Sequence, residues 1–355
     1  MLAMISKEFR QVRRDKRTLA MMIAMPVVLL VVFGYAASFD VTTLKVAVHG
    51  PGAAEVARLL PPPLEVISTD PSSGRELAET QLRDGKADLA VVTETGGAIV
   101  LIDGSELFNA RAAQQILTAA RPKILEMNLE ALPDFEIEVL YNPDLDTSSV
   151  LVPGLAGLIL LFVGTLLTSL GIVRERQAGT LDQLVVMPFK ARDVIIGKIA
   201  PYFLVASIDM AVVLFLANLL FDVPFRGSLW ILTLGSMLFL LVTLGVGVLI
   251  STVSENQGQA IQLGLMTLMP QVILSGIIFP LDSMEPGVRW IGYLLPLSYF
   301  NIISKGVMLK ATPITGLLWP FALLLLLGSI VFGLAMIRFS RDLIPTKPAA
   351  TEGTA

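Results

Sequence analysis

Long apolar runs alternate with shorter polar stretches along this chain, and the pattern predicts a membrane protein that crosses the bilayer several times. Each run is nearly free of charge and long enough to cross about 30 Å of hydrocarbon, which takes roughly 20 helical residues. We therefore expect an α-helical polytopic membrane protein with six transmembrane helices. The predicted spans are residues 18–39, 150–173, 199–221, 228–250, 260–281 and 314–337.

Residues 40–149 do not follow the membrane pattern and predict a small α/β domain inserted after the first span. Short β-branched runs bounded by turn residues indicate strands, and longer segments between them indicate helices. A proline at position 122 would bend or break the last helix. The expected strands are Lys45–His49, Leu64–Ser68, Asp88–Thr93, Ile99–Ile102 and Phe135–Tyr141; the expected helices are Gly52–Leu60, Ser73–Asp84 and Asn109–Ala131.

Residues 174–198 form a charged loop between the second and third predicted spans. Thr180 is a plausible helix N-cap and Pro188 a helix terminator, so the loop is expected to carry a short helix. Apolar residues at positions i, i+3 and i+4 give that helix one apolar face, which a loop exposed only to water does not need. These residues are Leu181, Leu184 and Val185.

Three further segments complete the predicted organisation. Residues 1–17 form a basic amphipathic helix suited to the surface of an anionic leaflet. The apolar run that follows exceeds the usual length of a signal-peptide core, so we expect it to be retained as a span although Ala36–Ser38 resembles a cleavage site. Residues 282–311 are too polar and too broken to span, and residues 338–355 form a polar tail.

Charge gives the predicted orientation. The chain is 54% hydrophobic and 16% charged, with a mean hydropathy of +0.74. Its net charge of −4 divides unevenly: residues 40–149 hold 18 acidic and 8 basic residues, a net of −10. Fourteen lysines and arginines lie in residues 1–17, 174–198 and 338–355, against four in the connections on the other side. The positive-inside rule therefore places both termini and the loop 174–198 in the cytoplasm, and the α/β domain outside.

The sequence offers little for catalysis or metal binding. Cysteine is absent, so a thiolate metal site is unavailable, and the single histidine, His49, limits metal binding and histidine-based catalysis. No motif of an intramembrane hydrolase occurs, and no G-x-x-x-x-G-K-[ST] loop is present to bind ATP phosphates. The carboxylates of the α/β domain show no ligand spacing and are expected to form a solvated acidic surface. We predict that this chain is not itself an enzyme and binds no cofactor.

The loop also carries the residues of a known pattern. It resembles the E-R-x-x-G-T-L-x-x-L-x-x-x-P motif, followed by G-K-x-x-P, of ABC-2 type transporter permeases, and the resemblance extends over nearly the whole chain. Two short turns of the α/β domain, Asp103–Ser105 and Tyr141–Pro143, are similar to those of the exporter branch. The matching loop residues are Glu175, Arg176, Gly179, Thr180, Leu181, Leu184 and Pro188, then Gly197, Lys198 and Pro201.

The resemblance implies a type V exporter arrangement, in which the loop 174–198 is a coupling helix seated in a cleft of a separate ATPase subunit. Two copies of that P-loop ATPase would bind the ATP and Mg²⁺. A second permease copy, identical or a paralogue, would complete a dimer. Residues 282–311 would be re-entrant helices near the outer surface. The expected location is the cell (inner) membrane of a bacterium or archaeon, with lipid as a partner and no nucleic acid.

We expect ATP-driven export of amphipathic or hydrophobic cargo, such as drugs or lipids, because the spans offer an apolar path. A polysaccharide or lipid-linked glycan exporter is the alternative within the family. A membrane sensor with an extracytoplasmic ligand-binding domain is the alternative from another class, although four further spans and a short tail argue against it.

Asp209 is the ionisable residue deep inside a predicted span, where inserting an aspartate into the membrane costs a free energy of about 2.5 to 3.5 kcal/mol. It either makes a structural hydrogen bond, with Gln262 or Gln271 of the fifth span as partners, or faces the dimer seam. We take Asp209, Gln262 and Gln271 as candidates for the translocation path.

Overall fold

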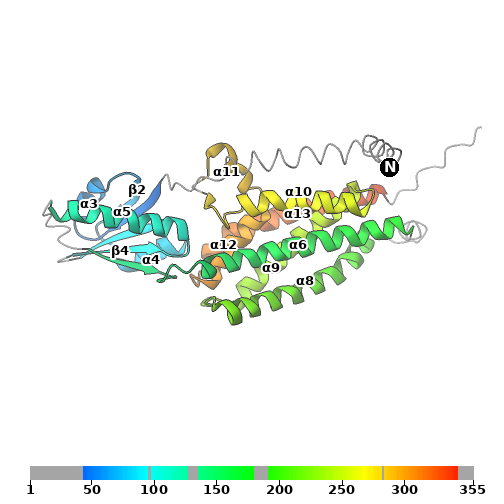
Figure 1. Ribbon diagram of the computed structural model, residues 1–355, viewed down its shortest axis with the longest axis horizontal. Helices are drawn as coiled ribbons and strands as arrows, with labels where there is room; N and C mark the ends of the chain where they lie inside the picture. The colour runs from blue at the N-terminus through cyan, green and yellow to red at the C-terminus, as the bar shows by residue number, and fades with distance from the viewer. Residues whose placement is uncertain (1–42, 95–96, 127–134, 180–190, 282–283, 343–355) are drawn as a thin grey trace, which may run out of the picture.

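The computed structural model describes residues 43–94, 97–126, 135–179, 191–281 and 284–342. Figure 1 shows a small α/β domain at one end of the long axis and long helices extending away from it. The predicted surface helix 1–17, the first predicted span 18–39 and residues 343–355 lie outside the described residues.

A five-stranded sheet in the order β2-β1-β3-β4-β5 forms the centre of the α/β domain. β1 pairs in parallel with β2 and β3, β4 is antiparallel to β3, and β5 is parallel to β4. All five predicted strands are present, with slightly different bounds. They are β1 (Leu44–His49), β2 (Leu64–Asp70), β3 (Leu89–Glu94), β4 (Gly97–Asp103) and β5 (Phe135–Leu140).

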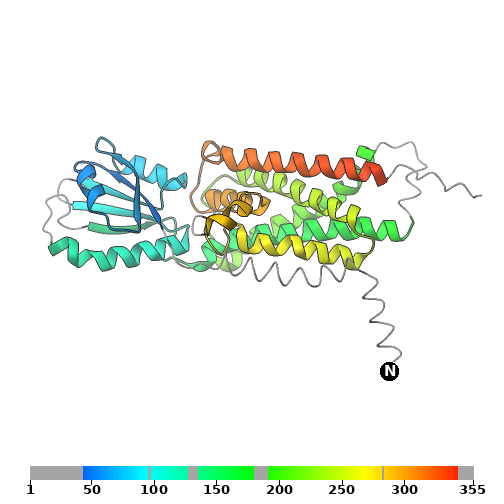
Figure 2. The same cartoon turned by 90° about the horizontal axis from the view of Figure 1, so that it is seen from above.

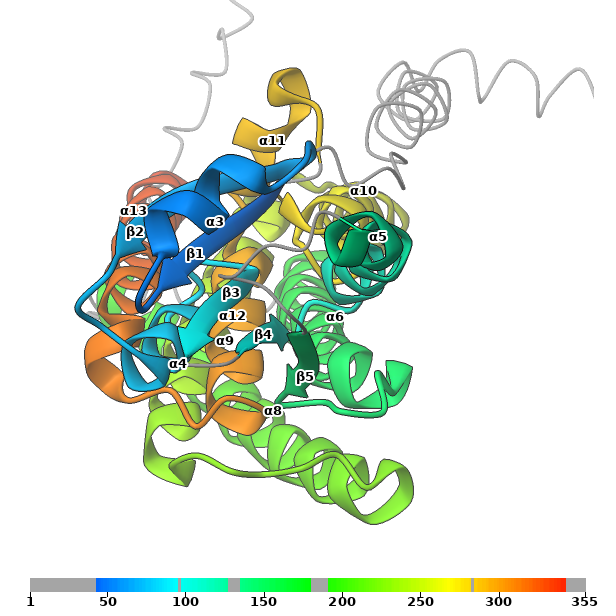
Figure 3. The same ribbon diagram turned by 90° about the vertical axis from the view of Figure 1, so that its left-hand side faces the viewer.

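Three helices cover the two faces of this sheet (Figure 3). Because side chains alternate between the faces of a strand, Val46 and Val48 pack towards α3 (Ala53–Leu59) and α5 (Leu107–Glu126), whereas Ala47 packs towards α4 (Arg75–Arg83). The predicted break at Pro122 does not occur, since α5 continues through it.

The rest of the described chain is helical, and four of its helices are long and apolar enough to cross a membrane. α6 and α9 lie at the centre, with 56% and 61% of their most apolar stretches buried, whereas α8 and α13 are only 12% and 22% buried. The bounds are α6 (Thr147–Gln177), α8 (Ala191–Phe221), α9 (Leu229–Val253), α10 (Gln257–Leu274), α11 (Pro286–Gly292), α12 (Pro296–Met308), the short 3-10 helix η2 (Ile314–Leu317) and α13 (Leu318–Asp342).

The largest difference from the predicted spans concerns residues 260–281. The helix α10 ends at Leu274, and Gly276 follows with a φ of +80° that favours glycine and turns the chain. α10 is therefore shorter than predicted and is not among the four helices that meet the length and hydropathy of a span. The helices α6 and α8 also extend into the predicted loop 174–198, since α6 ends at Gln177 and α8 begins at Ala191.

Residues 282–311 contain two short helices, α11 and α12, of which α12 is almost wholly buried. Phe300 of α12 stacks on Phe239 of α9 with ring centroids 4.6 Å apart. Gly157 of α6 permits the close approach of α12, since a Cβ there would lie 2.4 Å from the Phe300 ring. α12 thus lies inside the end of the bundle that faces the α/β domain (Figure 2).

Candidate functional site

The predicted coupling residues lie at the end of α6 and beyond it. Arg176 binds the end of α9, with its Nη1 atom 2.8 Å from the Ser251 carbonyl oxygen and 3.2 Å from that of Ser254. Gly179 has a φ of +71° and follows the last turn of α6, where Glu175 also lies. Thr180, Leu181, Leu184 and Pro188 lie outside the described residues, so the helix predicted for them stays a prediction.

The candidate path residues are not joined by hydrogen bonds. Asp209 of α8 is partly buried, and its Oδ2 atom has no hydrogen-bond partner. Gln271 of α10 instead accepts from the backbone N–H of Leu297 and donates to the carbonyl of Thr267, both at 3.4 Å. The hydrogen bond between Asp209 and Gln271 considered above is therefore wrong for the described structure, because α12 provides the partner of Gln271. Gln262 is partly exposed on α10.

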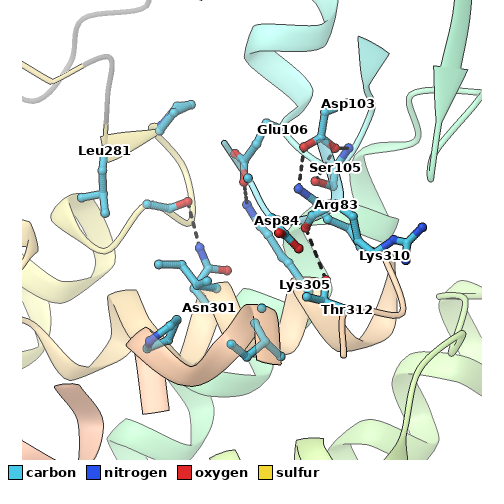
Figure 4. Close-up of a pocket in the computed structure, with 18 of the residues that line it drawn as sticks. Arg83, Asp84, Asp103, Ser105, Glu106, Leu281, Asn301, Lys305, Lys310 and Thr312 are labelled. Atoms are coloured by element: carbon cyan, nitrogen blue, oxygen red, sulfur yellow. Dashed lines mark hydrogen bonds and ion pairs between the residues drawn. The ribbon is translucent and has the colours of Figure 1, made fainter. Parts of the chain in front are cut away.

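A polar junction joins the α/β domain to the helical bundle, and its main contact is an ion pair (Figure 4). Lys310 follows α12 and places its Nζ atom 2.5 Å from Oδ2 of Asp103, which ends β4. The same Nζ donates to the carbonyl of Leu82 at 3.1 Å and lies 5.8 Å from the centre of the Tyr141 ring. The side chains of Lys310 and Asp103 are only 9% and 4% exposed, so the pair is withdrawn from water.

Two further contacts extend the junction. Lys305 of α12 pairs with Glu106 at 3.3 Å, and the hydroxyl of Thr312 donates to the carbonyl of Arg83 at 3.4 Å. Lysines from the bundle thus meet acidic residues and helix-end carbonyls of the α/β domain, as Figure 4 shows.

The turn motifs Asp103–Ser105 and Tyr141–Pro143 hold Asp103 in place. They follow neighbouring parallel strands, β4 and β5, and so meet at one edge of the sheet. The Asn142 amide donates to the Gly104 carbonyl at 3.3 Å, and a Cβ on Gly104 would lie 2.7 Å from the Leu140 carbonyl oxygen. The backbone N–H and the hydroxyl of Ser105 both donate to Asp103 Oδ1, at 3.0 and 2.7 Å. This leaves Asp103 Oδ2 directed to Lys310.

Burial controls the electrostatics of the junction. Burial lowers the pKa of Lys310, but the charge and hydrogen bond of Asp103 outweigh it, so the pKa is raised above its ordinary value. Burial raises the pKa of Asp88, even though the Lys45 N–H and the Asn109 amide donate to its oxygens at 2.8 and 2.9 Å. The expected solvated acidic surface is therefore wrong for Asp103, which is 3% exposed and pairs with Lys310 of the bundle.

A cavity of about 370 Å³ lies at the junction. Its domain side is charged and polar, and its bundle side adds aromatic and aliphatic surface. It can accommodate a small polar group with an apolar extension. The residues that carry this chemistry are Arg83, Asp84, Asp88, Asp103, Glu106, Asn109, Ser275, Leu281, Tyr293, Asn301, Lys305, Lys310 and Trp319. The sequence shows Lys305 and Lys310 only as residues that prevent a span, and it carries no signal for their partners.

His49 has a structural environment. It is fully buried, with Nδ1 2.7 Å from the Ser73 hydroxyl and Nε2 3.2 Å from Gln81 Oε1. Within the part of the chain that the structure describes, no group of histidine, aspartate or glutamate residues is arranged to hold a metal ion.

Comparison with known proteins agrees with this architecture. The chain belongs to the family described as ABC-2 family transporter protein, whose family model matches residues 16–338, and the resemblance drawn from the loop motif is confirmed. It is therefore a membrane permease of an ABC transporter.

Similar proteins occur in Escherichia coli K12. The chain is 30% identical over 365 residues to the probable multidrug ABC transporter permease YbhS, covering 96% of this chain and 97% of that protein. It is 27% identical over 341 residues to the probable multidrug ABC transporter permease YbhR, covering 89% and 92%. It is 28% identical over 221 residues to the inner membrane transport permease YhhJ, covering 61% and 58%.

Proposed function

We propose that this permease is the membrane subunit of an ATP-driven exporter that moves drug-like or lipid-like amphipathic cargo out of the cytoplasm or inner leaflet. The observation that carries the proposal is similarity over almost the full length to permeases named as probable multidrug ABC transporter permeases. The apolar helices α6, α8, α9 and α13 support a path for hydrophobic cargo.

The geometry of α6 supports opposite locations for the α/β domain and the coupling loop. α6 begins next to the α/β domain and ends at the far end of the bundle (Figure 1). Its 31 residues measure about 46 Å at 1.5 Å per residue, more than the ~30 Å hydrocarbon core. With the basic residues of loop 174–198 in the cytoplasm, the α/β domain lies outside. Both termini are then cytoplasmic in the inner membrane of a bacterium or archaeon.

The proposed assembly contains two permeases, identical or paralogous, and two copies of a P-loop ATPase that bind ATP and Mg²⁺. The contact that Arg176 makes with the end of α9 supports a coupling role, because it joins the helix leading into the loop to the centre of the bundle. A displacement of the loop would therefore reach α9 through this contact.

Leu184→Asp tests the coupling role. We expect the variant to insert normally but to lose co-purification of the ATPase subunit and cargo-stimulated ATP hydrolysis, because an unpaired carboxylate buried in an interface costs about 3 to 5 kcal/mol. Gln183→Asp adds the same charge beside the apolar face and is expected to retain both. Wild-type co-purification and ATP hydrolysis in Leu184→Asp would contradict the proposal.

A further inference from the structure

A basic groove lies on the other side of the Lys310 contact from the junction cavity. It is open, has a volume of about 420 Å³, and is formed by α4, the end of β5 and the connections that follow α8 and α12. The α/β domain and the helical bundle therefore both contribute to it. Its charged and polar lining consists of Glu79, Arg83, Tyr141, Arg226 and Lys310.

Two of the four charges in this lining are cancelled by neighbouring residues. The carboxylate of Glu79 accepts from Nε of Arg75 at 2.6 Å. The ammonium group of Lys310 is paired with Asp103. The charges that remain in the basic groove are those of the two arginines, and both are positive.

Arg83 and Arg226 have no counter-charge. Neither forms an ion pair with any residue that the structure describes. Arg83 interacts with the hydroxyl of Tyr141, which is a neutral group. Two guanidinium groups that share one groove repel each other, so the groove is complementary to an anion placed between them.

The main chain of both arginines is held in place by contacts with the end of α12. The backbone N–H of Arg226 donates to the Met308 carbonyl at 3.0 Å. The carbonyl of Arg83 accepts from the hydroxyl of Thr312 at 3.4 Å. An anion that binds both side chains therefore has to order only these side chains and not the loops that carry them, which lowers the entropic cost of binding.

Arg226 also differs from the other basic residues of the predicted outer connections. In the proposed orientation lysine and arginine are disfavoured on this side of the membrane. Lys305 and Lys310 form ion pairs with the α/β domain, and Arg289 donates to the Met284 carbonyl at 3.1 Å. Arg226 remains available for a partner outside the described chain.

The position of Arg226 indicates the depth of the groove relative to the membrane. It lies between the end of α8 and the start of α9, two apolar helices long enough to span. Phe225 beside it is 39% exposed, and Trp230 in the first turn of α9 is 82% exposed. Exposed aromatic residues at the end of a span are typical of the interface, where lipid head groups lie.

We propose that the basic groove binds the phosphate group of an anionic ligand between the guanidinium groups of Arg83 and Arg226. A guanidinium group donates two parallel hydrogen bonds to phosphate oxygens, which favours this anion over chloride. The phosphate comes either from the head group of an anionic phospholipid or from free phosphate. The inference does not rest on the proposed function, because it requires neither cargo nor the ATPase.

Thermal unfolding of the full chain in dodecyl maltoside at neutral pH tests the proposal. A ligand that binds only the folded state raises the unfolding temperature in a saturable manner. Phosphatidylglycerol, with a net negative charge, is expected to do so. Phosphatidylcholine should bind about tenfold more weakly, because its quaternary ammonium group adds a cation beside the two arginines. Equal affinities for the two lipids, without an effect of phosphate, would overturn the proposal.

Variants test the two arginines. Arg83→Gln and Arg226→Gln should each weaken phosphatidylglycerol binding about tenfold. Neither should lower the unfolding temperature without lipid, because neither breaks an ion pair. Arg226→Lys keeps the charge but not the paired donors and should have an intermediate affinity. Arg58→Gln is the matched control, since Arg58 is an exposed arginine of α3 outside the groove.

Wild-type affinity in Arg83→Gln and Arg226→Gln would contradict the assignment, and so would equal weakening in Arg58→Gln, which would show a general effect of surface charge. Inorganic phosphate separates the two sources. A rise in unfolding temperature with phosphate, relative to chloride at equal ionic strength, that is lost in both variants would assign the groove to the free anion. A rise with phosphatidylglycerol alone assigns it to the lipid head group, and no saturable rise with either ligand would exclude the site.

Discussion

Lys310 is a charged side chain that the fold withdraws from water at the boundary between two parts of the molecule. Its ammonium group contacts Asp103, the Leu82 carbonyl and the Tyr141 ring, all in the α/β domain. A buried ion pair of this kind is not necessarily more stable than an apolar contact, but loss of one partner leaves the other charge buried and uncompensated.

Lys310→Met should therefore destabilise the protein by about 3 to 5 kcal/mol, because Asp103 loses its counter-charge. Thermal unfolding of the purified protein measures the effect. Lys86→Met is the control: Lys86 is 65% exposed and pairs with Asp84 at 3.0 Å, so its loss should cost less than about 1 kcal/mol. Equal effects of the two variants would show that the junction pair is not buried in solution.

The pH dependence of this pair follows from the raised pKa of Lys310. Because the folded pKa lies above the ordinary value of 10.5, the stability from the pair is fully present below 10.5 and is lost as pH rises through the folded pKa. The difference in unfolding midpoint between the wild type and Lys310→Met should stay constant from pH 7 to about pH 10 and then shrink. A difference that disappears below pH 9 would contradict the raised pKa.

Asp209 presents the opposite situation, a carboxylate in an apolar helix with one buried oxygen unpaired. Since the buried Oδ2 atom has no hydrogen bond to lose, Asp209→Leu should leave thermal stability unchanged or raise it, by up to the roughly 2.5 to 3.5 kcal/mol that an aspartate costs at the centre of a span. If Asp209 lies on the translocation path, both Asp209→Leu and Asp209→Asn should lose transport while remaining folded. A lower unfolding temperature in Asp209→Leu would show a structural role instead.

Among the elements, α6 packs on four other helices, which are α8, α9, α10 and α12. Asp146 caps its first turn by accepting from the Ser149 N–H at 3.0 Å, and Gly179 follows its last turn. Between these ends, glycines permit close packing where another helix presents a large side chain. Gly157 against Phe300 is the tightest such contact with α12.

Gly157→Ala should destabilise the protein by about 1 to 3 kcal/mol, because the added Cβ would lie 2.4 Å from the Phe300 ring and 2.8 Å from Leu297. Gly333→Ala in α13 is the matched control, since its Cβ would meet nothing within 4 Å and a helical alanine gains about 0.5 to 1 kcal/mol over glycine. Thermal unfolding should thus shift in opposite directions, and a parallel shift would contradict the packing of α12 on α6.

At the scale of the whole molecule, the α/β domain and the end of α6 should lie on opposite sides of the membrane. Because the chain has no cysteine, Ser72→Cys and Gln177→Cys each introduce a single thiol at an exposed position. In intact cells an impermeant thiol reagent should label Ser72→Cys only, and Gln177→Cys should react after the membrane is permeabilised. Labelling of both in intact cells would exclude the proposed orientation.

Features that depend on neighbouring residues could be predicted from the sequence alone. The length of an apolar run determines whether a helix can cross a membrane, and strand alternation determines which face of a strand is buried. The sequence therefore predicts α6, α8, α9, α13 and the five strands, although the ends of these elements differ from the predicted bounds. The family membership could be predicted for the same reason, because the motif from Glu175 to Pro188 is contiguous. The end of α10 could not be predicted from the sequence, because the chain after Leu274 remains largely apolar and only the turn at Gly276 ends the helix.

The junction was decided by tertiary structure. Asp103 and Lys310 lie 207 positions apart, and nothing local to either residue indicates the other. Only the packing of α12 inside the bundle and the pairing of β4 with β5 bring them together. The same holds for the junction cavity, because the residues that line it lie far apart in the sequence. Local patterns therefore determined the class of protein and its elements, whereas long-range contacts decided where charge is buried and where the junction cavity forms.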